Sequence, residues 1–276
     1  MTIEELLVFG KSHCHSDHAK ILLAEILNKN PLELLTCLDE IVPIEKIELY
    51  KKEVIALEEG KPLQYVIGHV NFYGNKFYVD ERCLIPRFET EELVENTIKY
   101  VNEYFSEPID IIDLGTGSGV IGLTLENKLS TNSVDLIDIS KEALEVTKKN
   151  KDNLNSKANL IQSDFFNNIN KKYDVIISNP PYIKDNEEIE DIVKDNEPHL
   201  ALYAGVNGLD CYEKILMNIS NHMKDRCLIA FEIGYEQSKD IINLINKYLD
   251  NVKIEVKKDL SEKDRMIFIF KNLNNN

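Results

Sequence analysis

From about residue 86 onward, short apolar runs alternate with longer helical patterns, and this alternation limits the possible folds more than any other feature. Strands that alternate with helices build a mostly parallel sheet with helices on both faces. Only the loop 257–265 separates the last two runs, so we expect the final strand to be antiparallel. The sequence therefore predicts an α/β domain with strands at 109–114, 134–139, 159–162, 173–178, 227–233, 253–256 and 266–270.

The sequence before residue 86 follows a different pattern of apolar and polar residues. Residues 2–59 show helical periodicity, and Gly60-Lys61-Pro62 ends it. Two β-rich runs then flank the turn dipeptide Gly74-Asn75, which is typical of a hairpin. We therefore predict a helical bundle over residues 1–62, a β-hairpin connector over 63–85 and the α/β domain over 86–276.

Composition and charge narrow the class of protein. The chain carries 32 Lys and Arg against 48 Asp and Glu, a net charge of −16, which disfavours binding to phosphate backbones. Glu4 and Glu5 lie where a signal peptide would be basic, and no apolar run could span a bilayer. The five cysteines form no CxxC pair, and the cluster His13–His18 lacks a second pair of ligands. We expect a cytoplasmic protein that binds no metal and no membrane.

A glycine loop follows the first strand and precedes a helix. Gly115, Gly117 and Gly119, with Thr116 and Ser118 between them, let the backbone approach a cofactor closely. Asp113 and the glycine spacing are nearer to a loop that binds S-adenosylmethionine than to one that binds a dinucleotide. At the end of the next strand, Asp138 can accept hydrogen bonds from a ribose diol, as it would with either cofactor.

Two further residues follow the third strand. Asp164 can accept from an adenine amino group, and Phe165 can stack on the adenine ring. On local grounds alone, a turn aspartate and a core phenylalanine explain the same residues equally well.

The sequence Asn179-Pro180-Pro181-Tyr182 follows the fourth strand, at the edge where ligands bind in open α/β sheets. Two prolines stiffen this loop and lack N–H donors. Asn179 Oδ1 and the Pro180 carbonyl can each accept one N–H of a planar amino group, while Tyr182 packs against the substrate or the sulfonium. Catalysis would be mainly positioning and electrostatic support, with Asn179, Pro180 and Tyr182 as catalytic residues and residues 179–182 as the substrate contact.

With these motifs in place, the chain resembles the release-factor glutamine methyltransferase family nearly end to end. The resemblance also rests on Pro62-Leu63-Gln64-Tyr65-Val66-Ile67-Gly68, Leu84-Ile85-Pro86-Arg87-Phe88-Glu89-Thr90-Glu91, Glu197-Pro198 with Ala201-Leu202, and Asn207-Gly208-Leu209-Asp210. It departs at Phe88, where the family usually has proline, at Phe165, where some members have tryptophan, and at Glu262, where glycine is usual.

The resemblance implies a Rossmann-like methyltransferase domain with a mostly parallel seven-stranded sheet. It implies methylation of the side-chain nitrogen N5 of the glutamine in the Gly-Gly-Gln motif of peptide chain release factors, which modulates translation termination. The cofactor would be S-adenosylmethionine, leaving as S-adenosylhomocysteine, with contacts at Gly115–Gly119, Asp138, Phe165 and Asn179. Asp164 is a further candidate for cofactor contact because of its position after the third strand. We expect a monomer whose partner is the release factor.

An alternative remains open at this stage. Adenine-N6 and guanine-N2 methyltransferases use the same Asn-Pro-Pro-Tyr chemistry, although the net charge of −16 disfavours direct binding to nucleic acid. The roles of two charged residues are also open: Arg87 could face the cleft or pair with Glu89 or Glu91, and Glu197 could lie in a loop over the substrate.

Overall fold

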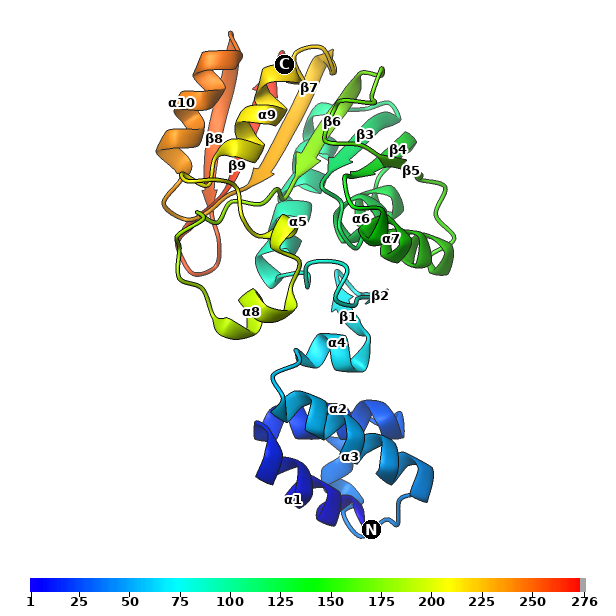
Figure 1. Ribbon diagram of the computed structural model, residues 1–276. Coiled ribbons are helices and arrows are strands. Elements are labelled where there is room, and N and C mark those ends of the chain that lie inside the picture. Colours follow the sequence, from blue (N-terminus) through cyan, green and yellow to red (C-terminus); the bar gives the residue numbers. More distant parts are fainter. Residues whose placement is uncertain (274–276) are drawn as a thin grey trace. The chain divides into compact units, whose positions relative to one another are not determined.

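The computed structural model describes residues 1–273, so the last three residues of the predicted domain 86–276 lie outside the described part. The chain forms two compact units (Figure 1). One comprises Met1–His69 together with the short segment Glu190–Asn196. The other begins at Val70 and contains the rest of the described chain.

The first unit is helical. It contains α1 (Ile3–His13), α2 (Ser16–Leu27), η1 (Glu33–Thr36), α3 (Ile44–Glu58), α4 (Leu63–Ile67) and α8 (Asp191–Asn196). Its apolar residues form a core of their own, in which the Tyr50 hydroxyl donates to the Ala19 carbonyl at 3.1 Å. Thr2 caps α1 through a capping box with Glu5, which satisfies backbone groups at the helix start.

The predicted hairpin is confirmed. It consists of β1 (His69–Phe72) and β2 (Asn75–Tyr78), and Gly74 in the turn has a positive φ of 80°. Phe72 and Phe77 are buried in one core of the second unit. The residues just before the hairpin form the short helix α4.

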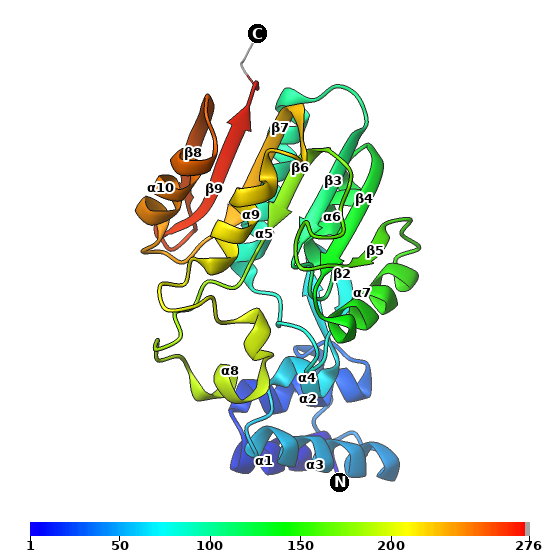
Figure 2. The ribbon, with the colours of Figure 1, turned by 45° about the horizontal axis from the view of Figure 1, so that its top comes forward.

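The second unit is built on the predicted seven-stranded sheet (Figure 2). Its strand order is β5-β4-β3-β6-β7-β9-β8, in which β9 runs antiparallel to both of its neighbours and the other pairings are parallel. The strands are β3 (Ile109–Leu114), β4 (Thr131–Asp138), β5 (Asn159–Gln162), β6 (Tyr173–Ser178), β7 (Met223–Glu232), β8 (Val252–Lys258) and β9 (Asp264–Lys271).

Both faces of this sheet are buried. Alternate residues along one strand point to opposite faces, so Ile111 of β3 joins one apolar core and Ile112 joins the other. The first core includes α5 (Phe88–Tyr104) and α6 (Val120–Lys128), and the second includes α9 (Asp210–Ile219) and α10 (Ser238–Tyr248). The remaining helices of this unit are α7 (Lys141–Asn153), which contacts β4 and β5, and η2 (His199–Ala201).

The strand order creates one crevice. From β3 the chain moves outward to β4 and β5, then returns to place β6 on the other side of β3. The loops after β3 and β6 therefore diverge at the carboxyl edge of the sheet, and ligands of open α/β sheets bind at such a point.

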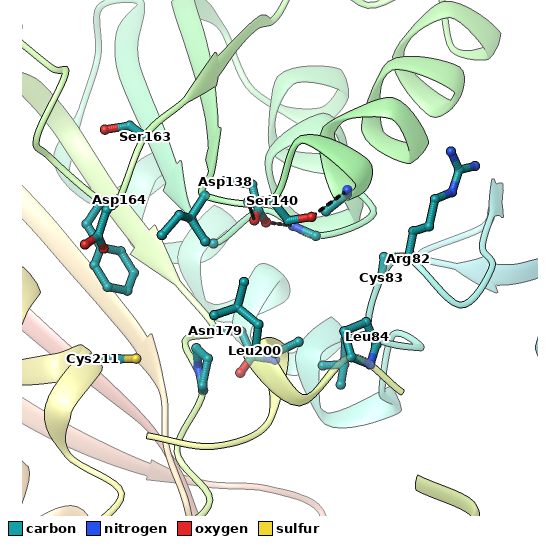
Figure 3. Close-up of a pocket in the computed structure, with 18 of the residues that line it drawn as sticks. Arg82, Cys83, Leu84, Asp138, Ser140, Ser163, Asp164, Asn179, Leu200 and Cys211 are labelled. Carbon is teal, nitrogen blue, oxygen red and sulfur yellow. Dashed lines mark hydrogen bonds between the residues drawn. The ribbon is translucent and has the colours of Figure 1, made fainter. Parts of the chain in front are cut away.

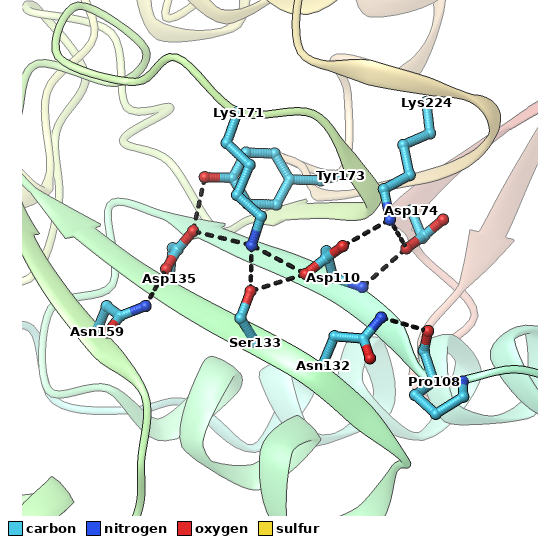
Figure 4. A network of polar contacts seen from close by, with 10 residues as sticks. All are labelled: Pro108, Asp110, Asn132, Ser133, Asp135, Asn159, Lys171, Tyr173, Asp174 and Lys224. Atoms are coloured by element: carbon cyan, nitrogen blue, oxygen red, sulfur yellow. Dashed lines mark hydrogen bonds and ion pairs between the residues drawn. The ribbon is translucent and has the colours of Figure 1, made fainter.

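The opposite edge of the sheet carries a polar network (Figure 4). Lys224 Nζ donates to Asp110 at 2.6 Å and to Asp174 at 2.7 Å, and Lys171 Nζ lies 2.9 Å from the other oxygen of Asp110. Burial raises the pKa of Asp110, but hydrogen bonds from Lys224, Lys171 and Ser133 outweigh it and bring the pKa to about 2. The network ties β3, β4, β6 and β7 together away from the crevice.

No helix among residues 1–273 is both long enough and apolar enough to cross a membrane.

Candidate active site

A pocket opens at the carboxyl edge of the sheet, within the second unit (Figure 3). The ends of β3, β4 and β6 contribute Gly115, Asp138 and Asn179 to its wall, so residues far apart in sequence converge there. The full lining is Arg82, Cys83, Leu84, Gly115, Gly117, Asp138, Ile139, Ser140, Ala143, Ser163, Asp164, Phe165, Asn179, Pro181, Pro198, Leu200, Ala201, Cys211 and Lys214.

The three loop glycines have different surroundings. Gly115 and Gly117 line the pocket with φ values of 72° and 56°, and a Cβ added to either would meet no protein atom within 4 Å. A Cβ on Gly119, whose φ is 85°, would lie 2.8 Å from Thr147 Cγ2. The first two glycines therefore leave open a surface that a ligand can approach, whereas Gly119 allows the loop to pack on α7.

A buried carboxyl group supports this loop from behind. Asp113 Oδ2 accepts from Thr116 Oγ1 at 2.6 Å and from the Gly122 amide at 3.0 Å. Burial, with a smaller effect from the neighbouring Asp138 carboxylate, raises the pKa of Asp113 to about 6. Thr116 and Ser118 are themselves buried and do not line the pocket, so their side chains shape the loop.

Asp138 faces the pocket while its carboxylate fixes two backbone segments (Figure 3). Its Oδ2 accepts from the Gly117 amide at 2.8 Å, and its Oδ1 accepts from the Ser140 amide at 2.9 Å. Burial raises its pKa, against the effect of these amides. Because a carboxylate has about four acceptor positions, Asp138 keeps capacity for a ligand hydroxyl pair.

The loop after β5 supplies another part of the wall. Asp164 and Phe165 both line the pocket, and Asp164 lies 3.6 Å from Lys214 Nζ of α9. Phe165 has a left-handed backbone with φ 47°, which is uncommon for an aromatic residue. Such strain concentrates at ligand sites, and here it accompanies a ring that borders both the pocket and the second core.

The Asn-Pro-Pro-Tyr loop is divided between the pocket and the core. Asn179 and Pro181 line the pocket, whereas Pro180 is buried. Tyr182 packs against the second core and does not line the pocket, and burial raises the pKa of its hydroxyl to about 12. The Asn179 amide Nδ2 donates to Thr90 Oγ1 at 3.3 Å.

Arg87 and Glu197, whose roles the sequence did not determine, form an ion pair. Arg87 Nη2 donates to Glu197 Oε1 at 2.6 Å, and the other carboxylate oxygen accepts from the Ile85 amide at 3.0 Å. Arg87 therefore pairs with Glu197, and not with its helix neighbours Glu89 or Glu91. Glu197 joins the segment before α5 to the loop that contributes Pro198 and Leu200 to the pocket.

Several lining residues were not predicted from the sequence. The side chains of Cys83, Leu84 and Leu200 are apolar or weakly polar. Cys211 lies in the first turn of α9, whose sequence contains no motif typical of a ligand site. The sequence around Leu84 and Ala201 resembles that of the family, but its residue types do not predict a pocket wall. Within residues 1–273, no group of three or more His, Cys, Asp or Glu side chains is arranged to hold a metal ion.

Comparison with known proteins identifies the family. Residues 90–201 match the model of the methyltransferase small domain, and residues 15–68 match that of the PrmC N-terminal domain. The release factor glutamine methyltransferase of Bacillus subtilis is 37% identical, with 96% of each chain covered. The protein of the same name from Streptococcus pneumoniae is 36% identical, covering 96% of this chain and 94% of its own.

Solved structures support the fold. A methyltransferase from Pyrococcus furiosus has a TM-score of 0.54 at 16% identity, covering 72% of this chain and 90% of its own. The 16S rRNA N2 G1207 methyltransferase of Thermus thermophilus, in complex with AdoMet and guanosine, has a TM-score of 0.52 at 14% identity, covering 74% of this chain and 50% of its own. Together, the pocket geometry, the domain matches and the end-to-end relatives show that this chain belongs to the release factor glutamine methyltransferase family.

Proposed function

We propose that this enzyme transfers a methyl group from S-adenosylmethionine to the side-chain nitrogen N5 of the glutamine in the Gly-Gly-Gln motif of peptide chain release factors. The observation that carries the proposal is the position of Asn179. It faces the same pocket as Gly115, Gly117 and Asp138, so an amide acceptor held by Asn179 would lie beside the cofactor. The names of the relatives supply the class of acceptor.

The residues of the pocket fit this cofactor. S-adenosylmethionine supplies a methyl group on a positively charged sulfur, which leaves without protonation. Gly115 and Gly117 leave room for its amino-acid portion, as their missing Cβ atoms would point into space free of protein atoms. Asp138 lines the pocket and would accept from the ribose hydroxyls, and Asp164 and Phe165 border the part of the pocket proposed for adenine.

The acceptor amide is held by carbonyl oxygens. Asn179 Oδ1 and the Pro180 carbonyl would each accept one N–H of the glutamine side chain and aim the nitrogen at the methyl group. These oxygens also stabilise positive charge that grows on the nitrogen during transfer. Pro181 lines the pocket. Tyr182 packs against the second core, so its main role would be to support the loop from that side.

Further aspects of the function are part of the same proposal. S-adenosylhomocysteine would be the product, and the enzyme would act as a cytoplasmic monomer without a metal. Residues 1–62 would form a helical bundle, residues 63–85 a connector and residues 86–276 the catalytic domain. The net charge of −16 favours a protein substrate over the alternative, a nucleic acid, because phosphate backbones recruit Lys and Arg.

A labelling experiment tests the acceptor. The enzyme is incubated with S-adenosylmethionine labelled in the methyl group, together with a release factor, its Gly-Gly-Gln→Gly-Gly-Ala variant, bulk DNA or bulk RNA. We expect label on the release factor and none on the other three. Label on nucleic acid, or equal label on the variant, would refute the proposal.

Asn179→Ala separates acceptor positioning from cofactor binding. We expect turnover to be abolished, because the amide loses one of its two acceptors, while the cofactor Kd changes by less than about tenfold, or 1.4 kcal/mol. Single-turnover assays and calorimetric titration with S-adenosylhomocysteine measure the two quantities. A much larger loss of affinity would mean that Asn179 mainly holds the cofactor.

A further inference from the structure

We propose that Thr90 and Glu232 are positioning residues that hold the Asn179 carboxamide with its nitrogen away from the acceptor and its oxygen toward it. The inference rests on the proposed role of Asn179 as the group that accepts from the substrate amide. Neither Thr90 nor Glu232 lines the pocket, so both act through Asn179.

A chain of hydrogen bonds links the three side chains. Asn179 Nδ2 donates to Thr90 Oγ1 at 3.3 Å, and Thr90 Oγ1 donates to Glu232 Oε2 at 2.7 Å. The three residues come from the loop after β6, the first turns of α5 and the end of β7. Thr90 and Glu232 are 2% and 1% exposed, so the bond between the Thr90 hydroxyl and the Glu232 carboxylate is shielded from water.

The direction of these hydrogen bonds is set by the buried carboxylate of Glu232. An ionised carboxylate only accepts hydrogen bonds, so Glu232 requires the single hydroxyl hydrogen of Thr90. The Thr90 oxygen can then only accept a hydrogen bond from Asn179, so the NH2 group of the Asn179 carboxamide is the donor. The carboxamide oxygen is left for the pocket, where the proposed acceptor is itself a donor. An inverted carboxamide would place two N–H groups against the substrate N–H groups.

The surroundings of Glu232 make this polarity sensitive to protonation. Burial raises the pKa of Glu232 to about 7, against the lowering effects of the Thr90 hydroxyl, the Arg265 guanidinium and the Asn179 amide, while Glu89 raises it further. The Tyr182 and Tyr212 hydroxyls also interact electrostatically with Glu232. A protonated Glu232 can donate to Thr90, which frees the Thr90 hydrogen to donate to the Asn179 oxygen and inverts the carboxamide.

The test compares variants of one helix. Thr90→Val keeps the shape of the side chain and removes the hydroxyl, and we expect kcat for the release factor to fall by about ten- to a hundredfold, as loss of a buried polar partner implies. The KM for the release factor and the cofactor Kd should stay within about twofold, since Thr90 does not line the pocket. Thr90→Ser restores the hydroxyl and should recover most of the lost kcat.

Thr97→Val is the matched control for removing a buried hydroxyl from α5. Thr97 is fully buried, and its hydroxyl donates to the Leu93 carbonyl within the helix at 2.7 Å. We expect its kcat to match that of the unmodified enzyme. If Thr90→Val and Thr97→Val lower kcat equally, the effect belongs to the packing of α5 and the proposal is wrong.

The pH profile supplies a readout that packing alone would not move. In the unmodified enzyme kcat should rise as pH increases through about 7, as Glu232 ionises. Glu232→Gln and Thr90→Val should both lack this limb, and Thr90→Ser should keep it. A limb that persists in Thr90→Val, or a kcat for that variant within about twofold of the original, overturns the proposal. The unmodified enzyme must first label the release factor; failure there refutes the proposed function instead.

Discussion

At the scale of single residues, the least expected group is the Asp113 carboxyl behind the glycine loop. It is fully buried, and burial raises its pKa from an ordinary 3.8 to about 6. The Asp113 carboxyl group therefore binds its proton more tightly in the folded protein than in the unfolded chain. Its contribution to stability is present below about pH 4 and is lost as pH rises through about 6.

Asp113→Asn should remove this pH dependence. An amide oxygen can take over the bonds from Thr116 and Gly122, while no charge forms at high pH. We expect the free energy of unfolding of the variant, relative to the original, to increase by about 2 kcal/mol between about pH 4 and about pH 7. Urea unfolding at several pH values measures it, and a difference that stays constant with pH would contradict the assignment.

Residues with local signals could be predicted from the sequence. The positions of Gly115, Gly117, Asp138 and Asn179 follow from short motifs at the ends of apolar strands, and all four line the pocket. The contact of Thr90 with Glu232 spans 142 residues, and that of Arg87 with Glu197 spans 110. Such pairs depend on how strands are ordered in the sheet, which no local pattern encodes.

At the scale of elements, the apolar runs gave correct strands, with differences at the ends. The strand predicted at 227–233 begins four residues earlier, at Met223, and includes the polar residues Lys224 and Arg226. Hydrophobic periodicity misses this extension because Lys224 serves the polar network, where it bonds Asp110 and Asp174. The antiparallel final strand is confirmed, but its place between β7 and β8 could not be predicted, because either order buries the same apolar faces.

Asp110→Asn tests the polar network that joins these strands. The pKa of Asp110 is about 2, below its ordinary 3.8, so its contribution to stability is present above about pH 4 and is lost as pH falls through about 2. We expect the variant to lose about 2 kcal/mol of unfolding free energy at neutral pH and less at about pH 3. Denaturant titrations at the two pH values give both numbers.

The matched control is an ion pair outside the network. Asp152 pairs with Lys148 one helical turn away on α7, and both side chains are more than half exposed. Asp152→Asn should cost no more than about 0.5 kcal/mol, because solvent screens exposed pairs. Equal losses in Asp152→Asn and Asp110→Asn would mean that the network adds no stability beyond an ordinary surface pair.

At the scale of the whole molecule, the chain contains two units with separate apolar cores. The bundle core contains Leu23 and Tyr50, and no residue of it belongs to the two cores of the sheet. The short segment Glu190–Asn196 groups with the helical unit although it lies far along the chain. The side chain of Asn196 donates to the Gly60 carbonyl at 3.1 Å, a link 136 residues apart that the sequence alone could not predict.

Separate cores imply that damage to one unit should remain local. Leu23 is fully buried in α2, so Leu23→Ala should lower the unfolding free energy of the helical unit by about 2–5 kcal/mol. Amide hydrogen exchange should then rise in α1, α2 and α3 but not in β3, β4 or β6. The cofactor Kd should stay within about twofold, because the pocket is lined only by residues of the other unit.

Leu136→Ala is the reciprocal variant. Leu136 is fully buried in β4, within a core of the sheet unit. Its loss should accelerate exchange in the sheet strands and weaken cofactor binding, because the Asp138 carboxylate that fixes Gly117 lies at the end of the same strand. If either substitution accelerates exchange throughout residues 1–273, the chain unfolds as one cooperative body, and the division into independently stable units is wrong.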